Sequence, residues 1–260
     1  MPELNLDPAQ FELAVQLLAQ SRHAVAFTGA GISTPSGIPD FRSPQSGLWR
    51  NVNPLEVASI YGFRHQPERF YEWIFPLAEV TVNAEPNSAH LALAQLESSG
   101  PIKAIITQNI DMLHTKAGSQ HILEVHGHLR ELTCVRCYRV YESEPFLAAF
   151  LTTRQMPGCP ACLNVLKPNV ILFGEQLPVM VWNEARRQAK QCDLMLVIGS
   201  SLAVAPAGDL PAVARARGAR LIIVNLAETH MDGEADLVFR TNVVELLPKL
   251  AAAVIEARAV

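Results

Sequence analysis

The 260-residue chain is long enough for one large domain, or for one domain with a small inserted module. Its 49% hydrophobic and 18% charged residues are typical of a globular protein with a substantial core. The formal net charge of −4 gives no electrostatic reason to expect direct binding of nucleic acid.

The N-terminus and the apolar runs bear on targeting. Met1–Leu4 lacks the basic residues with which a signal peptide starts. The apolar positions from Phe11 to Leu18 are spaced like those of a helix and are interrupted by Gln16. No run of about 20 apolar residues is present, so no membrane span is expected. We therefore expect a cytoplasmic protein without a membrane partner, a compartment in which disulfides are disfavoured.

The first predicted helix begins at Asp7 and Pro8 and runs to about Gln20. After it, apolar runs typical of strands alternate with helical patterns. The predicted strands are Val25–Phe27, Ala104–Ile106, Val170–Phe173, Leu194–Ile198, Leu221–Val224 and Leu237–Phe239. The later helices are Ser88–Leu96, Val179–Ala189, Leu210–Ala216 and Val243–Ala257. This alternation predicts an α/β fold, in which helices cover both faces of a mostly parallel, Rossmann-like sheet.

Two segments interrupt the alternation, and each predicts an insertion packed beside the sheet. Residues 43–87 hold aromatic residues and short helical patterns but no convincing strand. Residues 128–165 hold four of the five cysteines. The main sheet domain is then assembled from residues 1–42, 88–127 and 166–260.

Four cysteines form two Cys-x-x-Cys pairs, Cys134 with Cys137 and Cys159 with Cys162. Four thiolates at this spacing suit tetrahedral Zn²⁺ at about 2.3 Å and leave no position open for water. We therefore predict one structural zinc in a zinc-ribbon module at 128–165, whose removal unfolds the module. The alternative is a set of redox or incidental cysteines. Cys192 stands alone near an apolar strand and is predicted to be a buried core thiol.

Three predicted strands end in small or polar residues, and these ends are expected to meet at one edge of the sheet. They are Gly29-Ala30-Gly31, Thr107-Gln108-Asn109 and Gly199-Ser200-Ser201. A glycine turn directly after a strand can bring backbone N–H groups to a diphosphate. Thr34 stands where the dinucleotide fingerprint has its third glycine, and the prolines that follow disfavour a long helix. The segment therefore predicts a loop that carries Asp40-Phe41-Arg42 back over a bound ligand.

Polar residues near the second of these ends suit a nucleotide. Gln108, Asn109 and Asp111 can exchange hydrogen bonds with ribose hydroxyls and a carboxamide. The alternative is a capped turn, in which Asn109 and Asp111 satisfy only backbone groups. His126 precedes Gly127 between the sheet and the first cysteine pair, and histidine can serve as a general base near neutral pH. Most of the eight histidines are expected to be surface or core residues.

Two further segments carry weaker signals. Phe173-Gly174-Glu175 could present a backbone edge to which an extended peptide adds as a strand. The alternative is an ordinary core strand that ends at a glycine. Gly199-Ser200-Ser201 and Asn225-Leu226 follow apolar strands and suit an adenosine ribose and phosphate, although strand-to-loop connections often hold such residues.

In their order along the chain, these motifs resemble the sirtuins, a family of NAD-dependent protein lysine deacylases. The resemblance extends from about residue 20 to 245. It is carried by Gly-Ala-Gly-Ile-Ser, Ser-Gly-Ile-Pro-Asp-Phe-Arg, Thr-Gln-Asn-Ile-Asp, His-Gly, the two zinc knuckles, Pro-Asn-Val with Phe-Gly-Glu, Gly-Ser-Ser-Leu and Asn-Leu. Ser-Thr-Pro-Ser in the first loop is similar to compact prokaryotic members. The resemblance implies NAD as co-substrate, acyl-lysine proteins or peptides as substrates, and nicotinamide, O-acetyl-ADP-ribose and free lysine as products.

The resemblance also implies a role for each matched position. His126 would be the general base that deprotonates a ribose hydroxyl, and Asn109 would order that ribose. The residues implied to bind NAD are Gly29, Ala30, Gly31, Thr34, Phe41, Arg42, Gln108, Asn109, Ile110, Asp111, His126, Gly199, Ser200, Ser201, Asn225, Leu226 and Val243. The residues implied to border the acyl-lysine channel and to pair with the peptide are Val170, Phe173, Gly174 and Glu175.

One departure concerns the acyl group. Sirtuins that remove succinyl or malonyl groups share a Tyr-x-x-Arg pair that grips the acyl carboxylate, after a His-x-Pro segment. In those sirtuins the pair begins seven residues after the proline. Here the segment is His65-Gln66-Pro67, so Ile74 and Leu77 stand where the tyrosine and the arginine would be. Tyr61 and Arg64 have the spacing of the pair but precede the proline. An apolar pocket disfavours a buried carboxylate without a partner. We therefore predict removal of acetyl or longer apolar acyl groups in preference to succinyl or malonyl groups.

Two alternative functions stay open. The first is transfer of ADP-ribose to a protein side chain, which uses the same NAD pocket with another nucleophile. Intact His126 and Asn109 favour deacylation, because deprotonation of a hydroxyl matters only after the acyl oxygen has attacked. The second is a non-catalytic NAD sensor or scaffold, and the full set of implied catalytic residues argues against it.

Overall fold

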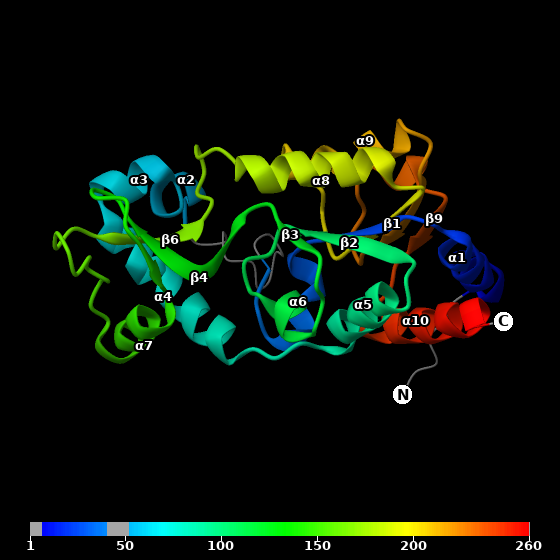
Figure 1. The fold of residues 1–260 in the computed structure, drawn as a ribbon, viewed down its shortest axis with the longest axis horizontal. Helices are drawn as coiled ribbons and strands as arrows, with labels where there is room; N and C mark the ends of the chain where they lie inside the picture. The colour runs from blue at the N-terminus through cyan, green and yellow to red at the C-terminus, as the bar shows by residue number, and fades with distance from the viewer. Residues whose placement is uncertain (1–6, 41–51, 260) are drawn as a thin grey trace.

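A six-stranded parallel sheet forms the centre of the molecule, in a computed structural model that describes residues 7–40 and 52–259 (Figure 1). Its strand order is β3-β2-β1-β7-β8-β9. The strands are β1 (Ala24–Thr28), β2 (Ile102–Thr107), β3 (Ile122–Glu124), β7 (Leu194–Ile198), β8 (Arg220–Val224) and β9 (Leu237–Phe239). The α/β fold with a Rossmann-like sheet is confirmed, as are five of the six predicted strands.

Helices cover both faces of this sheet (Figure 1). Alternate residues of β1 show why its apolar run is continuous: Ala24 and Ala26 pack into one buried cluster, Val25 and Phe27 into the other. The first cluster is covered by α1 (Pro8–Gln20), α5 (Ser88–Ser98) and α10 (Val243–Ala259). The second is covered by α8 (Val179–Gln191) and α9 (Leu210–Arg215). All five helices were predicted from the sequence.

Cys192 lies in the second cluster, 5% exposed. Burial, together with the charge of Asp193, raises the pKa of its thiol to about 12. The predicted assignment as a core thiol is confirmed, since a neutral buried thiol packs as a small hydrophobic group.

The segment between the first glycine loop and α5 is helical where the structure describes it. It holds α2 (Pro54–Val57), α3 (Ile60–His65) and α4 (Pro67–Asn83). Short elements complete the fold: η1 (Ala30–Ile32), η2 (Thr34–Ser36), α6 (Leu113–Lys116), η3 (Ala207–Asp209) and η4 (Asp232–Glu234). The first glycine turn thus continues into two 3-10 turns and not into a long helix, as its prolines predict.

A second, antiparallel sheet lies beside the first, in the order β5-β4-β6 (Figure 1). It consists of β4 (Gly127–Cys134), β5 (Val140–Glu142) and β6 (Leu166–Val170), with α7 (Glu144–Thr153) packed alongside. The predicted strand Val170–Phe173 is wrong, because the strand ends at Val170 and pairs with β4 in this small sheet. An apolar run shows that a strand is buried but not which sheet it joins.

Gly127 allows this pairing. Its φ of +78° lies in the left-handed region, and a Cβ atom there would come within 2.0 Å of the carbonyl oxygen of Asn169. The small sheet therefore includes Gly127 and Leu166–Val170, which lie just outside the predicted module at 128–165. The limits of that module stay a prediction. Within the described residues, no helix is both long and apolar enough to span a membrane.

Candidate active site

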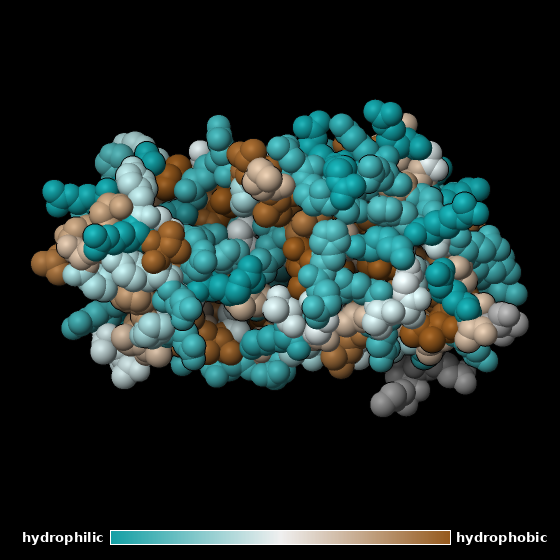
Figure 2. Space-filling view, in the orientation of Figure 1, coloured by the Kyte–Doolittle hydropathy of each residue, from teal (hydrophilic) through white to brown (hydrophobic). Residues whose placement is uncertain are grey.

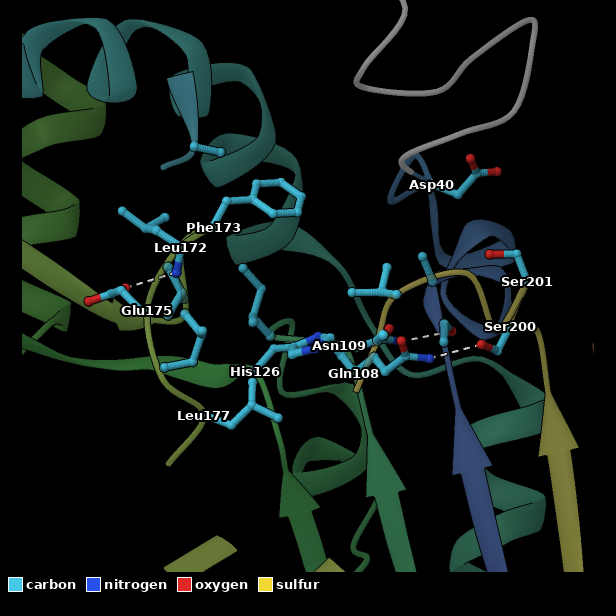
Figure 3. Close-up of a pocket in the computed structure, with 18 of the residues that line it drawn as sticks. Asp40, Gln108, Asn109, His126, Leu172, Phe173, Glu175, Leu177, Ser200 and Ser201 are labelled. Carbon is cyan, nitrogen blue, oxygen red and sulfur yellow. Dashed lines mark hydrogen bonds between the residues drawn. The ribbon is translucent and has the colours of Figure 1, made fainter. Parts of the chain in front are cut away.

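A pocket of about 840 Å³ opens at the carboxyl ends of β1, β2 and β7 (Figure 3), and the loop after β8 also lines it. This volume lies in the range of small-molecule sites. Its lining at the strand ends comprises Gly29, Ala30, Gly31, Gln108, Asn109, Ile110, Gly199, Ser200, Ser201, Asn225, Leu226 and Ala227. The predicted convergence of the three strand ends is confirmed, and a fourth loop joins them.

The loops after β1 and β7 meet through backbone contacts. The N–H of Gly31 donates to the carbonyl oxygen of Gly199 at 2.8 Å. Gly199 has a φ of +58°, and a Cβ atom on it would lie 2.4 Å from the nitrogen of Ile32. Between β1 and β7 the strand order changes direction, which is where ligands bind in open α/β sheets. The glycines therefore allow two loops to close on each other at the point where a dinucleotide is expected.

Asn109 belongs to a buried hydrogen-bond network beside the pocket. Its Nδ2 donates to the carbonyl oxygen of Gly29 and to Oγ of Ser33, both at 3.1 Å. Ser33 Oγ in turn donates to Oδ2 of Asp111 at 2.6 Å, and Oδ1 accepts from the N–H of Leu113 at 2.9 Å. Asp111 therefore does cap a turn, as the alternative interpretation holds, but it also fixes Ser33 and through it Asn109. Ser33 was not assigned a role from the sequence, although it directly follows the glycine turn.

Burial raises the pKa of the Asp111 carboxyl, while the hydrogen bonds from Ser33 and Leu113 oppose this shift. The side chain is 7% exposed and does not itself line the pocket. It is therefore one layer behind the surface that a ligand touches.

His126 lines the pocket next to Gln108 (Figure 3). Its Nδ1 lies 3.1 Å from the carbonyl oxygen of Gln108, which can only accept, so Nδ1 carries the proton and Nε2 keeps its lone pair. Burial lowers the pKa of His126, and the bond to Gln108 partly offsets this. The imidazole is neutral at pH 7 and can accept a proton. The Gln108 side chain is itself fixed, because Nε2 donates to Oγ of Ser200 at 2.8 Å.

One face of α4 forms an apolar part of the pocket wall. Phe70, Trp73, Ile74 and Leu77 all line it, at the i, i+3, i+4, i+7 spacing of a single helical face. Val170, Ile171, Leu172 and Leu177 also contribute. The resemblance places Ile74 and Leu77 at the acyl pocket, but Phe70 and Trp73 were not assigned to it, because such a stripe normally indicates a helix packed on the core.

The charge in the pocket is sparse. Among the described lining residues, Asp40, His126 and Glu175 are the titratable ones, and none is a lysine or arginine. The carboxylate of Glu175 forms an ion pair with Lys167, with 2.9 Å between Oε2 and Nζ.

Hydrophobic residues reach the surface near the start of α8, where Val179 and Met180 are exposed and Val179 lines the pocket (Figure 2).

Not every residue expected in the site lines it. Thr34 is exposed beside the pocket, and its hydroxyl donates to the carbonyl oxygen of Gly31 at 3.1 Å. Val243 is buried in the core at the start of α10. Phe41 and Arg42 lie outside the described residues. The four residues expected along the acyl-lysine channel do line the pocket: Val170, Phe173, Gly174 and Glu175. What each of them binds stays a prediction.

The four paired cysteines come together in the small sheet. The sulfurs of Cys134, Cys137, Cys159 and Cys162 all lie within 4.8 Å of one another. Cys134 Sγ is 3.4 Å from Cys162 Sγ, and Cys137 Sγ is 3.6 Å from Cys159 Sγ. Four thiolates about 2.3 Å from one Zn²⁺ would be about 3.8 Å apart, so the cluster fits a structural zinc.

Two buried histidines near the pocket predict acid sensitivity. The rings of His90 and His114 lie 4.9 Å apart, and Nε2 of His114 is 2.9 Å from Oγ1 of Thr28. Burial lowers the pKa of His90 to about 4 and that of His114 to about 3, the latter also because of His90.

Because unfolded histidine has a pKa of about 6.5, the unfolded chain binds more protons than the folded one below that pH. The free energy of unfolding should therefore be unaffected by these groups above pH 6.5 and should fall by up to about 1.4 kcal/mol per pH unit for each histidine as the pH drops toward 4. Urea unfolding at a series of pH values measures this. In a His90→Gln variant the slope should be shallower, and an unchanged slope would contradict the assignment.

Comparison with known proteins gives concordant matches. The Sir2 family model matches residues 29–206. NAD-dependent protein deacylase 2 of Archaeoglobus fulgidus is 47% identical over 238 residues, which cover 91% of this chain and 93% of the relative. A structure solved to explain the mechanism and regulation of Sir2 enzymes superposes with a TM-score of 0.90 at 46% identity, covering 95% of this chain and 98% of the other. Sir2Af2, solved with a myristoylated histone peptide, gives a TM-score of 0.84 at 40% identity and covers 97% and 99%.

Proposed function

This chain belongs to the Sir2 family, and from that premise we propose that it is an NAD-dependent protein lysine deacylase. It would consume one water, transfer the acyl group of acyl-lysine to ADP-ribose, and release O-acyl-ADP-ribose, nicotinamide and free lysine. His126 carries the proposal, because it lines a dinucleotide-sized pocket with Nδ1 protonated and Nε2 available. A non-catalytic NAD sensor would need no such base.

NAD fits this pocket as a co-substrate. The loops after β7 and β8, with Ser200 and Asn225, would hold the adenosine half, and the glycine turn after β1 would lie along the diphosphate. Asn109 would order the nicotinamide ribose, since its amide is already fixed by Gly29 and Ser33. Positioning the weakly nucleophilic acyl oxygen in line with the ribose carbon should supply much of the rate.

His126 would then accept, on Nε2, the proton of a ribose hydroxyl. The positive charge that develops on the ring is stabilised by the carbonyl oxygen of Gln108, which accepts from Nδ1–H. The oxygen of that hydroxyl would attack the acyl carbon of the imidate that forms when the acyl oxygen displaces nicotinamide, and water would complete the release of free lysine and O-acyl-ADP-ribose. No step runs through the zinc, because four cysteines leave the metal no open position.

The test is an acetyl-lysine peptide incubated with the protein, with and without NAD, while nicotinamide and deacetylated peptide are both followed. Deacylation predicts equal amounts of the two products and none without NAD. ADP-ribose transfer to a protein side chain would release nicotinamide without deacetylated peptide. Absence of both products would favour the non-catalytic alternative.

We further propose that the acyl group is apolar. Ile74 and Leu77 stand at the positions of the Tyr-x-x-Arg pair and both line the pocket. Tyr61 and Arg64, which have the same spacing, do not line it. The apolar face of α4 and the myristoylated peptide bound by Sir2Af2 support acyl chains of acetyl length or longer.

A succinyl carboxylate buried against α4 would lack a cationic partner among the described lining residues. An unpaired buried carboxylate costs several kcal/mol of binding free energy. Since each 1.36 kcal/mol is a factor of ten, we expect kcat/KM for succinyl-lysine peptide to be at least roughly 100-fold below that for acetyl-lysine peptide. An Ile74→Tyr/Leu77→Arg double variant should narrow this ratio by raising succinyl turnover, while Tyr61→Phe/Arg64→Met should leave it unchanged. Faster succinyl than acetyl turnover in the unmodified protein would overturn the proposal.

A further inference from the structure

Lys167 is a lysine whose ammonium group is turned into the protein. It lies on β6 with its side chain 12% exposed, and it does not line the pocket. Nζ forms an ion pair with Glu175 and also donates to the carbonyl oxygens of Pro168 at 3.1 Å and Val170 at 2.8 Å. An ammonium group has three donors, so all three are engaged within the protein.

The carboxylate of Glu175 connects Lys167 to the backbone of the following loop. Its Oε2 accepts the N–H of Leu172 at 2.8 Å (Figure 3). The same oxygen also accepts from the ammonium of Lys167. The N–H of Glu175 donates to the carbonyl oxygen of Leu172 at 3.0 Å, so residues 172–175 close into a turn, in which Gly174 has a φ of +86°. The carboxylate is thus used to hold the loop in shape.

The loop held in this way forms one wall of the pocket. Residues 171–175 all line it. The N–H of Ile171 donates to the carbonyl oxygen of His126 at 2.8 Å. Phe173 donates to the carbonyl oxygen of Ala58 at 2.9 Å and accepts from the N–H of Ile60 at 3.0 Å. The loop therefore links the base, the helical segment and the small sheet.

We propose that Lys167 is a positioning residue for acyl-peptide binding, which acts through Glu175 and the backbone of residues 171–175. The inference rests on the proposed function and deepens it. The resemblance implies that Glu175 contacts the substrate, whereas its carboxylate faces Lys167 and the N–H of Leu172. Glu175 thus contributes its backbone to the pocket and its side chain to the rigidity of the loop.

The decisive measurement compares the change in KM for the acetyl-lysine peptide with the change in KM for NAD. Lys167→Met leaves Glu175 partly buried without its cation and frees the carbonyl oxygen of Val170, so the loop loosens. We expect the KM for acetyl-lysine peptide to rise at least about tenfold, while the KM for NAD stays within about twofold. Lys167→Arg keeps a cation that can donate to the carboxylate of Glu175 and to the carbonyl oxygen of Val170, and it should therefore keep most of the peptide affinity.

A double-mutant cycle tests whether Glu175 is the partner. Glu175→Gln alone should raise the peptide KM in the same way, and the Lys167→Met/Glu175→Gln pair should cost no more than the worse single change. Additive effects of the two changes would mean that Glu175 contacts the peptide independently, which overturns the inference.

Arg215→Met is the matched control for a merely structural loss. Like Lys167, Arg215 both forms an ion pair and donates to a backbone carbonyl. Its Nη1 lies 3.1 Å from Asp236 Oδ2 and 3.1 Å from the carbonyl oxygen of Ala219. These residues lie near the amino end of β8, away from the pocket lining. Arg215→Met should lower the melting temperature and leave both KM values unchanged.

Hydrogen exchange separates this inference from the proposed function, because it needs no substrate. The amides of Leu172 and Glu175 should exchange faster in Lys167→Met than in the unmodified protein. Unchanged exchange, or an unchanged peptide KM, would overturn the role of Lys167. If the unmodified protein turns over no acyl-lysine peptide, the proposed function fails and the peptide part of the inference with it, whatever the exchange shows.

Discussion

Replacing His126 with alanine is expected to slow deacetylation of an acetyl-lysine peptide by roughly 10²–10⁴-fold, the usual contribution of a general base. At 1.36 kcal/mol per tenfold this is about 3–5 kcal/mol of transition-state stabilisation. The expectation follows from the hydrogen bond at Nδ1, which fixes the tautomer and leaves Nε2 as the proton acceptor. Steady-state release of deacetylated peptide measures the loss.

Two readouts separate loss of the base from loss of the fold. His121→Ala is the matched control, because Nδ1 of His121 also lies 2.8 Å from a backbone carbonyl oxygen, that of Lys103, but the residue does not line the pocket. Exchange of labelled nicotinamide into NAD in the presence of acyl peptide should persist in His126→Ala, since it precedes the deprotonation step. Undiminished deacetylation in His126→Ala would show that another group is the base.

The pH dependence of the unmodified protein supplies a further check on His126. Only the neutral imidazole can accept a proton, and burial lowers its pKa. The acid limb of kcat/KM should therefore lie below the ordinary histidine pKa of about 6.5, with activity retained from there to neutral pH. A limb above that value would contradict the direction of the shift.

Loss of zinc is the second large effect that we expect. Metal binding to four thiolates contributes roughly 10–16 kcal/mol in small zinc peptides, so a module of this size should unfold without it. Chelation, or Cys159→Ser, should release one zinc per chain and expose residues 128–165 to protease. Metal analysis and limited proteolysis measure the two results.

Activity should fall with the zinc even though the metal takes no part in the reaction. β4 and β6 pair Cys134 with Leu166 at one end and Gly127 with Val170 at the other, directly beside His126. Unfolding from the zinc end therefore loosens β4, the strand that begins directly after His126. Cys192→Ala is the control, because this thiol lies in the core of the main sheet and should leave the zinc content unchanged. A fully active protein without zinc would contradict this coupling.

Several parts of the site were predictable because their signals are local. A strand that ends in Gly29-Ala30-Gly31 and another that ends in Gly199-Ser200-Ser201 must meet at the same edge if the sheet is parallel. Two cysteine pairs at zinc spacing require only a compact loop between them. His126 could be singled out by its place between the sheet and the first pair, but its tautomer could not, because Gln108 is distant in sequence.

The α/β fold, the four zinc ligands and the strand ends that form the pocket could be read from the amino-acid sequence, since hydrophobic period, turn residues and ligand spacing are properties of short segments. Three features become visible only in the folded molecule: β6 joins the small sheet, Phe70 and Trp73 of α4 also line the pocket, and Lys167 forms an ion pair with Glu175. These contacts depend on how segments far apart in the chain pack together. A buried apolar stripe or a single lysine has the same local pattern whatever it packs against.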